Sequence, residues 1–398
     1  MEPENPTPVP VVSQNETAPV EMPIDSALSP QSGAAPAPEP GSLHWMFMGS
    51  QGLRAGWSIA IFFTIVLVPV IVLRLIAQLV QKAAPQAAKA SAQSQSLSPW
   101  MAIFGELIQV LLLLLVVFIM SLIERRKLLD YNLRGPRQVF HFSTGLLCGF
   151  VALSALVGSL VAGGWLHFGP VALSGGQIVM YAAVWGATFL LVGCFEEGLM
   201  RCYLLFTFGR GLNFWWAAGF IACVCGLLIR LTKGEGSWGA YILALAGIVP
   251  CLLLQLRKSP GVGFWNAAWV TSFLFGAMHT GNNGENWIGI FAAGAIGFVF
   301  CVSVRLTGSA WWAIGCHAAW DWGETYFYGT ADSGMVAKGH LLSTSPMGST
   351  FWSGGADGPE GSVLVLGIIL LLLIVVVAAF GRKRAAVVAT VAMESAAG

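Results

Sequence analysis

Residues 178–208 read IVMYAAVWGATFLLVGCFEEGLMRCYLLFTF, and this stretch decides the fold. A bilayer core of about 30 Å requires around 20 apolar residues per helix, so the stretch predicts a membrane-spanning helix. It also contains Glu196, Glu197 and Arg201. Ionisable side chains inside a spanning helix cost at least about 2.5–3.5 kcal/mol each, so they usually mark function. The stretch therefore predicts a functional site within the membrane.

Nine further stretches of similar length and hydropathy accompany this one. The ten expected spans cover residues 56–80, 101–123, 140–163, 178–208, 213–231, 239–256, 262–280, 287–306, 309–328 and 362–381. We therefore expect an all-α fold, a polytopic transmembrane helical bundle of about ten spans.

The composition of the whole chain agrees with this fold class. Of its 398 residues, 56% are hydrophobic and 10% are charged, against roughly 25% charged in a soluble globular protein. The formal net charge of +1 gives no field that would attract nucleic acid. The partner implied by the composition is membrane lipid, and no nucleic acid is expected.

The basic residues predict the orientation in the membrane. Three clusters, at 125–137, 257–258 and 382–384, fall on the same side if ten spans alternate in direction. Basic loops face the cytoplasm, and an even span count puts both ends of the chain on one side. We expect a multi-pass protein of the plasma (inner) membrane with both termini cytoplasmic.

The ends of the chain differ from its middle. Residues 1–50 are acidic and rich in Pro and Ala, which predicts a disordered cytoplasmic tail. A membrane domain is expected over 51–385 and a short C-terminal tail over 386–398. Residues 211–218 (GLNFWWAA) resemble 261–268 (GVGFWNAA). This near-repeat suggests that the two spans within 213–257 are an inserted hairpin.

The charges of the fourth span form a motif, FEEGLMR at 195–201. On a helix, Glu197 and Arg201 stand four residues apart on one face, with the acid toward the N-terminus, which is the favoured order for an ion pair. Glu196 projects about 100° away and has no partner in its own helix. An ion pair therefore accounts for Glu197 and Arg201, but it does not account for Glu196.

Two further motifs also set polar or aromatic residues four apart. Phe275 and His279 lie in the seventh span, and His317 and Asp321 lie in the ninth. Each pair shares one helix face. A single intramembrane histidine is more often satisfied by a neighbouring helix than catalytic, but three such motifs in one chain favour a functional cluster. We therefore expect two imidazoles and two or three carboxylates to converge.

Such a cluster has two chemical interpretations. A carboxylate beside an imidazole can hold and deprotonate a water, and a second histidine oriented by an acid can stabilise an oxyanion. This inventory indicates a hydrolase with no cofactor. The same donors, Glu196, His279, His317 and Asp321, could instead hold a divalent metal that activates the water.

At these residues the chain resembles the CPBP family of intramembrane proteases, which includes the type II CaaX prenyl endopeptidases and the Abi or bacteriocin-immunity proteins. The family pattern is Glu-Glu-x-x-x-Arg, then Phe-x-x-x-His, then His-x-x-x-Asn or Asp, and residues 196–201, 275–279 and 317–321 match it in order. Prenyl-processing members typically have Asn at the position of Asp321. The resemblance covers spans four and seven to nine and implies a family core at about 140–381.

The resemblance also implies roles for the motif residues. Glu196 and His279 would activate the attacking water, and His317 with Asp321 would stabilise the oxyanion. Glu197 and Arg201 would hold span four in place. The expected function is an intramembrane endopeptidase of the glutamate type that cleaves a hydrophobic or lipid-modified chain, of which a prenylated CaaX-type protein is one example.

Two other functions fit the same residues. Buried acids and histidines also relay protons, so a proton-coupled membrane transporter is one alternative. A catalytically inactive immunity or scaffold protein with the family fold is the other.

Overall fold

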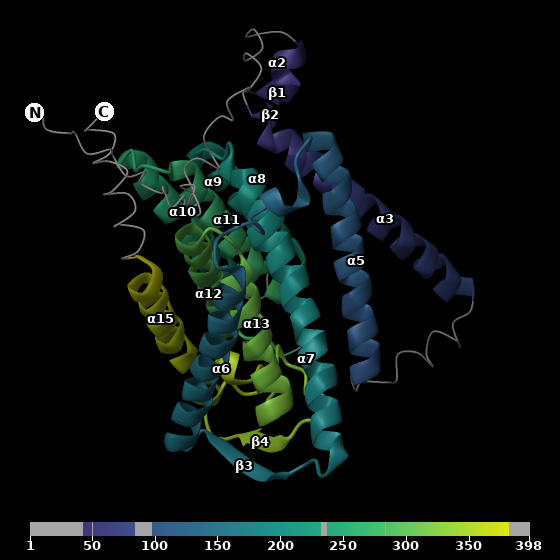
Figure 1. Cartoon of the computed structure of the whole chain (residues 1–398), viewed down its shortest axis with the longest axis vertical. Helices are drawn as coiled ribbons and strands as arrows, with labels where there is room; N and C mark the ends of the chain where they lie inside the picture. Colours follow the sequence, from purple (N-terminus) through teal and green to yellow (C-terminus); the bar gives the residue numbers. More distant parts are fainter. Residues whose placement is uncertain (1–42, 50, 84–97, 232–236, 283, 382–398) are drawn as a thin grey trace, which may run out of the picture.

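The protein was analysed as a computed structural model that describes residues 43–49, 51–83, 98–231, 237–282 and 284–381. Most of the expected N-terminal tail and all of the expected tail at 386–398 lie outside these residues. Within them, the chain is a bundle of long helices with two short pairs of strands (Figure 1). The expected fold class, a polytopic helical bundle, is confirmed.

The bundle is built from ten long helices. In chain order they are α3 (Ala55–Ala83), α5 (Pro99–Glu124), α6 (Gln138–Ala162), α7 (Gly176–Glu197), α9 (Phe214–Leu231), α10 (Ser237–Leu256), α11 (Val262–His279), α12 (Trp287–Thr307), α13 (Trp311–Trp322) and α15 (Leu364–Val376). The shorter helical segments are α2 (Leu43–Phe47), η1 (Leu128–Asp130), η2 (Gly198–Leu204), α8 (Leu205–Gly209), η3 (Gly323–Tyr328), α14 (Thr350–Ser353), η4 (Pro359–Gly361) and η5 (Val377–Gly381). The strands are β1 (Met48–Gly49), β2 (Gly52–Leu53), β3 (Leu166–Val171) and β4 (Leu342–Pro346).

Eight helices in the described residues are long and apolar enough to cross a membrane. One of them is the continuous run α7–η2–α8, 34 residues from Gly176 to Gly209. The other two expected spans correspond to α11 and to α13 with η3, which are also helical. These two carry His279, His317 and Asp321, whose polar side chains lower the hydropathy of the segments.

Glycines allow α6 and α13 to pack closely. A Cβ on Gly149 would lie 2.1 Å from the carbonyl oxygen of Cys316, and one on Gly315 would lie 2.3 Å from that of Phe142. Small residues at such crossings bring helix backbones together, which is how helices associate in lipid. The close contact fixes α13, and with it His317, at the centre of the bundle between α6, α7 and α12.

The ends of α12 have clear local causes. The side chain of Asn286 caps its start by accepting from the backbone N–H groups of Ile288 (2.8 Å) and Gly289 (3.3 Å). Asn is among the preferred residues at this position. Gly308 ends the helix in the left-handed conformation, with φ 82°.

The strand pair β3–β4 is not anticipated by the sequence. β3 follows α6, and it pairs antiparallel with β4, with Leu166 opposite Pro346. The pair closes one end of the bundle, opposite the end where α2 lies (Figure 1). It ties the long segment between η3 and α15 to the start of α7.

The expected hairpin at 213–257 corresponds to α9 and α10, which pack against each other and against α11. That this pair is an insertion into a core at 140–381 stays a prediction.

Candidate active site

The paired glutamates lie where α7 ends and the helix widens into the π-turn η2. Such wide turns occur frequently at functional sites. Glu197 ends α7 and pairs with Arg201 in η2: Nε is 3.1 Å from Oε2, and Nη1 is 3.2 Å from Oε1. Both side chains are fully buried. Of these two contacts, the one from Nη1 to Oε1 is a hydrogen bond, and the opposite charges compensate each other.

His317 brings the first and third motifs together. Its Nδ1 is 2.9 Å from Oε1 of Glu197, and its Nε2 is 3.4 Å from Oδ2 of Asp321 and 3.8 Å from Oε2 of Glu196. A carboxylate only accepts, so Nδ1 donates to Glu197. Glu197 therefore contacts both Arg201 and His317, whereas the sequence indicated the first contact alone.

The opposite nitrogen of His317 faces two acids from different helices. Asp321 belongs to α13 and Glu196 to α7. Two carboxylates cannot both accept from an unprotonated Nε2, so at least one proton is shared among these three groups. The arrangement can therefore move a proton over a short distance without a change of fold.

His279 is oriented by its own helix. Its Nδ1 is 2.8 Å from the carbonyl oxygen of Phe275. A carbonyl only accepts, so Nδ1 carries a proton and Nε2 of the neutral ring is an acceptor. The four-residue spacing of Phe275 and His279 thus fixes the tautomer in which Nε2 can accept a proton from water.

Phe275 packs among the other motif residues. Its ring centroid is 4.9 Å from that of His279 and 6.0 Å from that of His317. The guanidinium of Arg201 lies 4.4 Å from the centre of the same ring, within the range of a cation–π contact. Phe275 therefore contacts Arg201 of the ion pair and both imidazoles.

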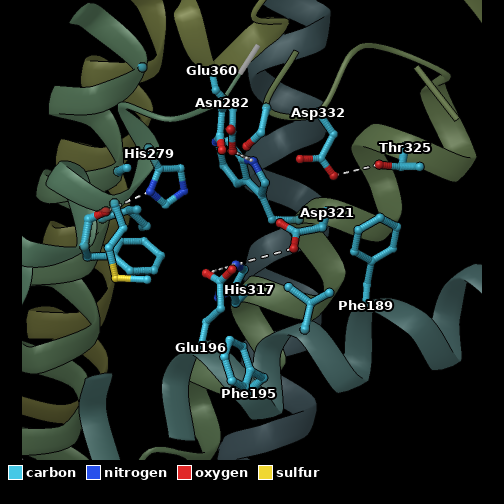
Figure 2. Close-up of a pocket in the computed structure, with 18 of the residues that line it drawn as sticks. Phe189, Phe195, Glu196, His279, Asn282, His317, Asp321, Thr325, Asp332 and Glu360 are labelled. Atoms are coloured by element: carbon cyan, nitrogen blue, oxygen red, sulfur yellow. Dashed lines mark hydrogen bonds and ion pairs between the residues drawn. The ribbon is translucent and has the colours of Figure 1, made fainter. Parts of the chain in front are cut away.

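A cavity of about 480 Å³ connects these side chains. Glu196, His279, His317, Asp321 and Phe275 all line it. Figure 2 shows His279 across the open space from Asp321, with Glu196 on a third side. Glu197 and Arg201 lie behind the wall. The structure thus brings four predicted site residues to one space, and it places no direct contact between Glu196 and His279.

The remainder of the wall is divided into an apolar part and an acidic part. The apolar part comes mainly from α7, α11 and α12 and includes Trp185, Phe189, Val192, Phe195, Met278, Ala293, Ile296 and Phe300. The acidic part comes from the segment before α15, where Asp332 and Glu360 face the cavity (Figure 2). Such a space suits an apolar chain with a polar backbone to be positioned.

Asp332 and Glu360 are each held by one donor. Thr325 donates to Oδ2 of Asp332 at 2.7 Å, and the indole of Trp320 donates to Oε1 of Glu360 at 2.7 Å. Burial raises the pKa of Asp332, although the Thr325 bond opposes the rise. Burial, followed by repulsion from Asp332, raises the pKa of Glu360 well above its usual range.

The four possible metal ligands named from the sequence line the cavity. Among the described residues, no three His, Cys, Asp or Glu side chains are arranged to hold a metal ion. His317 uses Nδ1 for Glu197 and His279 uses Nδ1 for Phe275, so Nε2 would be the metal-binding atom of each ring, and Glu196 and Asp321 both lie near Nε2 of His317. The four candidates for a metal therefore contact one another and the backbone.

Asp332, Glu360 and Glu106 are cavity residues that no motif identifies. Glu106 of α5 accepts from Gln109 at 2.9 Å beside the cavity. The first two lie in a polar, glycine-rich segment, where an acid is usually solvated. No local pattern separates them from such acids, because their burial depends on the strand pair and on Trp320.

Comparison with known families supports the same assignment. A model of the family described as Type II CAAX prenyl endopeptidase Rce1-like matches residues 250–323. The match covers α11 to α13 and includes His279, His317 and Asp321, whereas Glu196 lies outside it. No curated protein and no solved structure matches the chain. The match confirms the predicted resemblance, and with the eight apolar helices it supports a multi-pass membrane protease of this kind.

Proposed function

We propose that the protein is an intramembrane endopeptidase that hydrolyses a peptide bond of a membrane-associated chain. The convergence of Glu196, His279 and His317 on one cavity inside a helical bundle is the observation that carries this proposal. The family match supplies the reaction class, and the geometry supports a role for each side chain.

In this proposal, Glu196 and His279 activate the water. The free carboxylate oxygen of Glu196 and Nε2 of His279 face one cavity, and both are acceptors. A water between them loses a proton to one acceptor as its oxygen attacks the carbonyl carbon. Glu196 of α7 and His279 of α11 thus supply the base.

His317 and Asp321 stabilise the tetrahedral intermediate. The proton shared between Nε2 and the Asp321 carboxyl is donated to the oxyanion that forms from the carbonyl oxygen. When the C–N bond breaks, the departing amine takes the proton that Glu196 or His279 received. The proton donated to the oxyanion returns to the His317–Asp321 pair as the carbonyl re-forms. The second proton of the water leaves when the new carboxylic acid ionises, so the products are a carboxylate and an amine.

The proposed substrate is a hydrophobic or lipid-modified chain, because a site within the bilayer is reached by chains already partitioned there. The family description names CAAX prenyl endopeptidases, and a prenylated CaaX-type chain is one member of this class. The proposed location is the plasma (inner) membrane with both termini cytoplasmic, on the strength of the basic clusters.

Peptide cleavage by the purified full-length protein tests this function. The probe is a pool of N-palmitoylated, quenched fluorogenic peptides of randomised sequence in detergent. The wild type should cleave part of the pool, and Glu196→Gln should lower the rate by about 10²- to 10⁴-fold. A chelator added to the wild type should leave the rate unchanged.

Other outcomes favour the alternatives. Loss of activity on chelation, restored by a divalent ion, would support a metal-bound water instead. Absence of cleavage by folded wild type would contradict the protease, and pH-driven uptake in liposomes would then support a proton-coupled transporter. If neither activity is found, the result would support an inactive immunity or scaffold protein.

A further inference from the structure

The lining of the cavity extends to one end of the bundle. Lining residues come from the first turns of α5 (Ala102, Glu106), the last turn of α11 (Met278), the start of α15 (Val365) and the segment before α15 (Met335). These helix ends all lie at the end where β3 and β4 pair, because α6 leads into β3 and each later helix reverses direction (Figure 1). Met278 and Met335 are about half exposed. We call this the open end.

The other end of the cavity is closed. Its floor consists of Met200, Phe300 and Cys316, each at most 2% exposed. In the described residues, no loop at the end where α2 lies contributes to the lining. Past Met200 along the same helical run, Tyr203 is buried, and its ring lies 5.4 Å from that of Tyr131, which is also buried. We call this the closed end.

The two ends differ in charge. Basic residues at the closed end include Arg54, Arg125, Arg126, Lys127, Arg134, Arg137, Arg210, Arg257 and Lys258. In the described loops of the open end (163–175, 280–286 without 283, and 329–361), Lys338 is the one Lys or Arg, against Glu285, Asp332, Asp357 and Glu360. Arg230, at the end of α9, is an exception on a helix that does not line the cavity. Basic loops face the cytoplasm, so the open end faces away from it.

We infer that the substrate reaches the catalytic cavity from the extracytoplasmic face, and that it is a membrane-anchored chain whose scissile bond lies at the outer surface of the membrane. The inference rests on the proposed function, because it names the substrate class of the same site. It differs from what the family description alone suggests, since a CaaX motif lies at a C-terminus and ends in a free carboxylate.

The charge of the mouth supports this substrate class. Asp332, Glu360 and Glu106 line the cavity, and none of its described lining residues is Lys or Arg. A free carboxylate entering there would lose its hydration without a Lys or Arg to pair with it. Burying a charge without such a partner is costly. A bond within a chain, or one followed by a neutral or basic end, avoids that cost.

Cysteine labelling tests the side on which the cavity opens, independently of activity. Met335→Cys lies at the mouth, and Arg134→Cys is the matched variant at the closed end; both side chains are exposed. A membrane-impermeant maleimide applied to intact cells should label Met335→Cys, and should label Arg134→Cys only after permeabilisation. The wild type, with its eight native cysteines, gives the background. The reverse labelling pattern would overturn the inference.

The palmitoylated peptide pool tests the substrate class. In detergent, cleavage by the wild type and not by Glu196→Gln establishes the activity. If the wild type does not cleave the pool, the proposed function is contradicted, while the labelling still shows on which side the cavity opens. In sealed vesicles, right-side-out preparations should cleave externally added pool at least about tenfold faster than inside-out ones. C-terminally amidated peptides should be cleaved about tenfold or more faster than the same peptides with a free carboxylate. Preference for inside-out vesicles or for the free acid would overturn the inference.

Discussion

The bundle contains two buried charged clusters that differ in their balance of charge. The inner cluster surrounds Glu124 at the end of α5. Tyr131 donates to its Oε2 at 3.2 Å, Tyr203 to its Oε1 at 3.3 Å, and Arg210 lies 3.2 Å away. Arg126 adds a second cation at 3.8 Å. One acid therefore has two cations and two hydroxyl donors.

The second cluster, for which we propose a catalytic role, has the opposite balance. Glu196, Glu197 and Asp321 surround His317, while Arg201 is the one guanidinium among them. This cluster also borders a cavity, whereas Glu124 is enclosed by its donors. Removing one partner from a compensated buried cluster destabilises a fold. Acids in excess beside a cavity can instead bind a substrate or a proton.

The largest expected effect is loss of catalysis on removal of the free acceptor of His279. His279→Asn keeps a donor near the Phe275 carbonyl but lacks Nε2, so we expect kcat to fall by about 10²- to 10⁴-fold with an unchanged melting temperature. His167→Asn, on the exposed face of β3, is the matched control and should keep full activity. If the His279→Asn protein is active, His279 is not required as a proton acceptor, and that part of the proposal is contradicted.

The next effect is loss of folded protein when the ion pair is broken. Glu197→Ala leaves Arg201 buried without its carboxylate, which should lower the free energy of unfolding by about 3–5 kcal/mol. Glu197→Ala with Arg201→Ala should recover part of the folded yield, measured by size-exclusion chromatography in detergent. It should not recover activity, because Nδ1 of His317 still lacks its acceptor. Recovery of turnover would show that Glu197 acts through Arg201 alone.

A smaller effect is expected in the inner cluster. Tyr203→Phe removes one donor to Glu124, which should lower the free energy of unfolding by about 1.5–3 kcal/mol. Arg210 and Tyr131 still contact the carboxylate, so turnover per folded molecule should stay at the wild-type value. Thermal unfolding and kcat measured on the same sample check both statements. A variant that melts normally but turns over slowly would link the inner cluster to catalysis.

The smallest effect concerns the open end, where Glu285 and Asp357 lie near each other. Burial, followed by repulsion between them for Glu285, raises the pKa of Glu285 to about 7; burial raises that of Asp357 to about 6. Groups whose pKa is raised by folding stabilise the folded state at low pH, and this contribution is lost as pH rises through about 6 to 7. Amide exchange over 350–361, corrected for intrinsic rates, should therefore increase from pH 5 to pH 8.

A double substitution provides the control for this pH dependence. Glu285→Gln with Asp357→Asn removes these two titrating groups, so exchange in 350–361 should change less with pH than in the wild type. An equal pH dependence in the double variant would assign the effect to other groups.

Local patterns predict much of this molecule. Apolar runs of about 20 residues predict the long helices, since in lipid the backbone must satisfy its own hydrogen bonds. Four-residue spacing identifies Glu197 with Arg201 and places His317 beside Asp321. These are properties of one helix, so a single sequence contains them.

Contacts between distant segments are not contained in local patterns. The link from His317 to Glu197 joins residues 120 positions apart, and the one from Tyr203 to Glu124 joins residues 79 apart. Asp332 and Glu360 face the cavity because β3 pairs with β4 and Trp320 reaches Glu360. Each depends on how helices pack, which spacing along one helix does not specify.

The central claim is that one of the two clusters carries out chemistry and the other holds the fold. A matched pair, Glu196→Gln and Glu124→Gln, makes the same chemical change in each cluster and tests this claim most directly. Cleavage of the peptide pool and thermal unfolding are measured on both purified proteins. We predict that Glu196→Gln melts like the wild type and is inactive, while Glu124→Gln melts at a lower temperature and keeps its turnover per folded molecule. An active Glu196→Gln protein beside an inactive, normally melting Glu124→Gln protein would contradict the account.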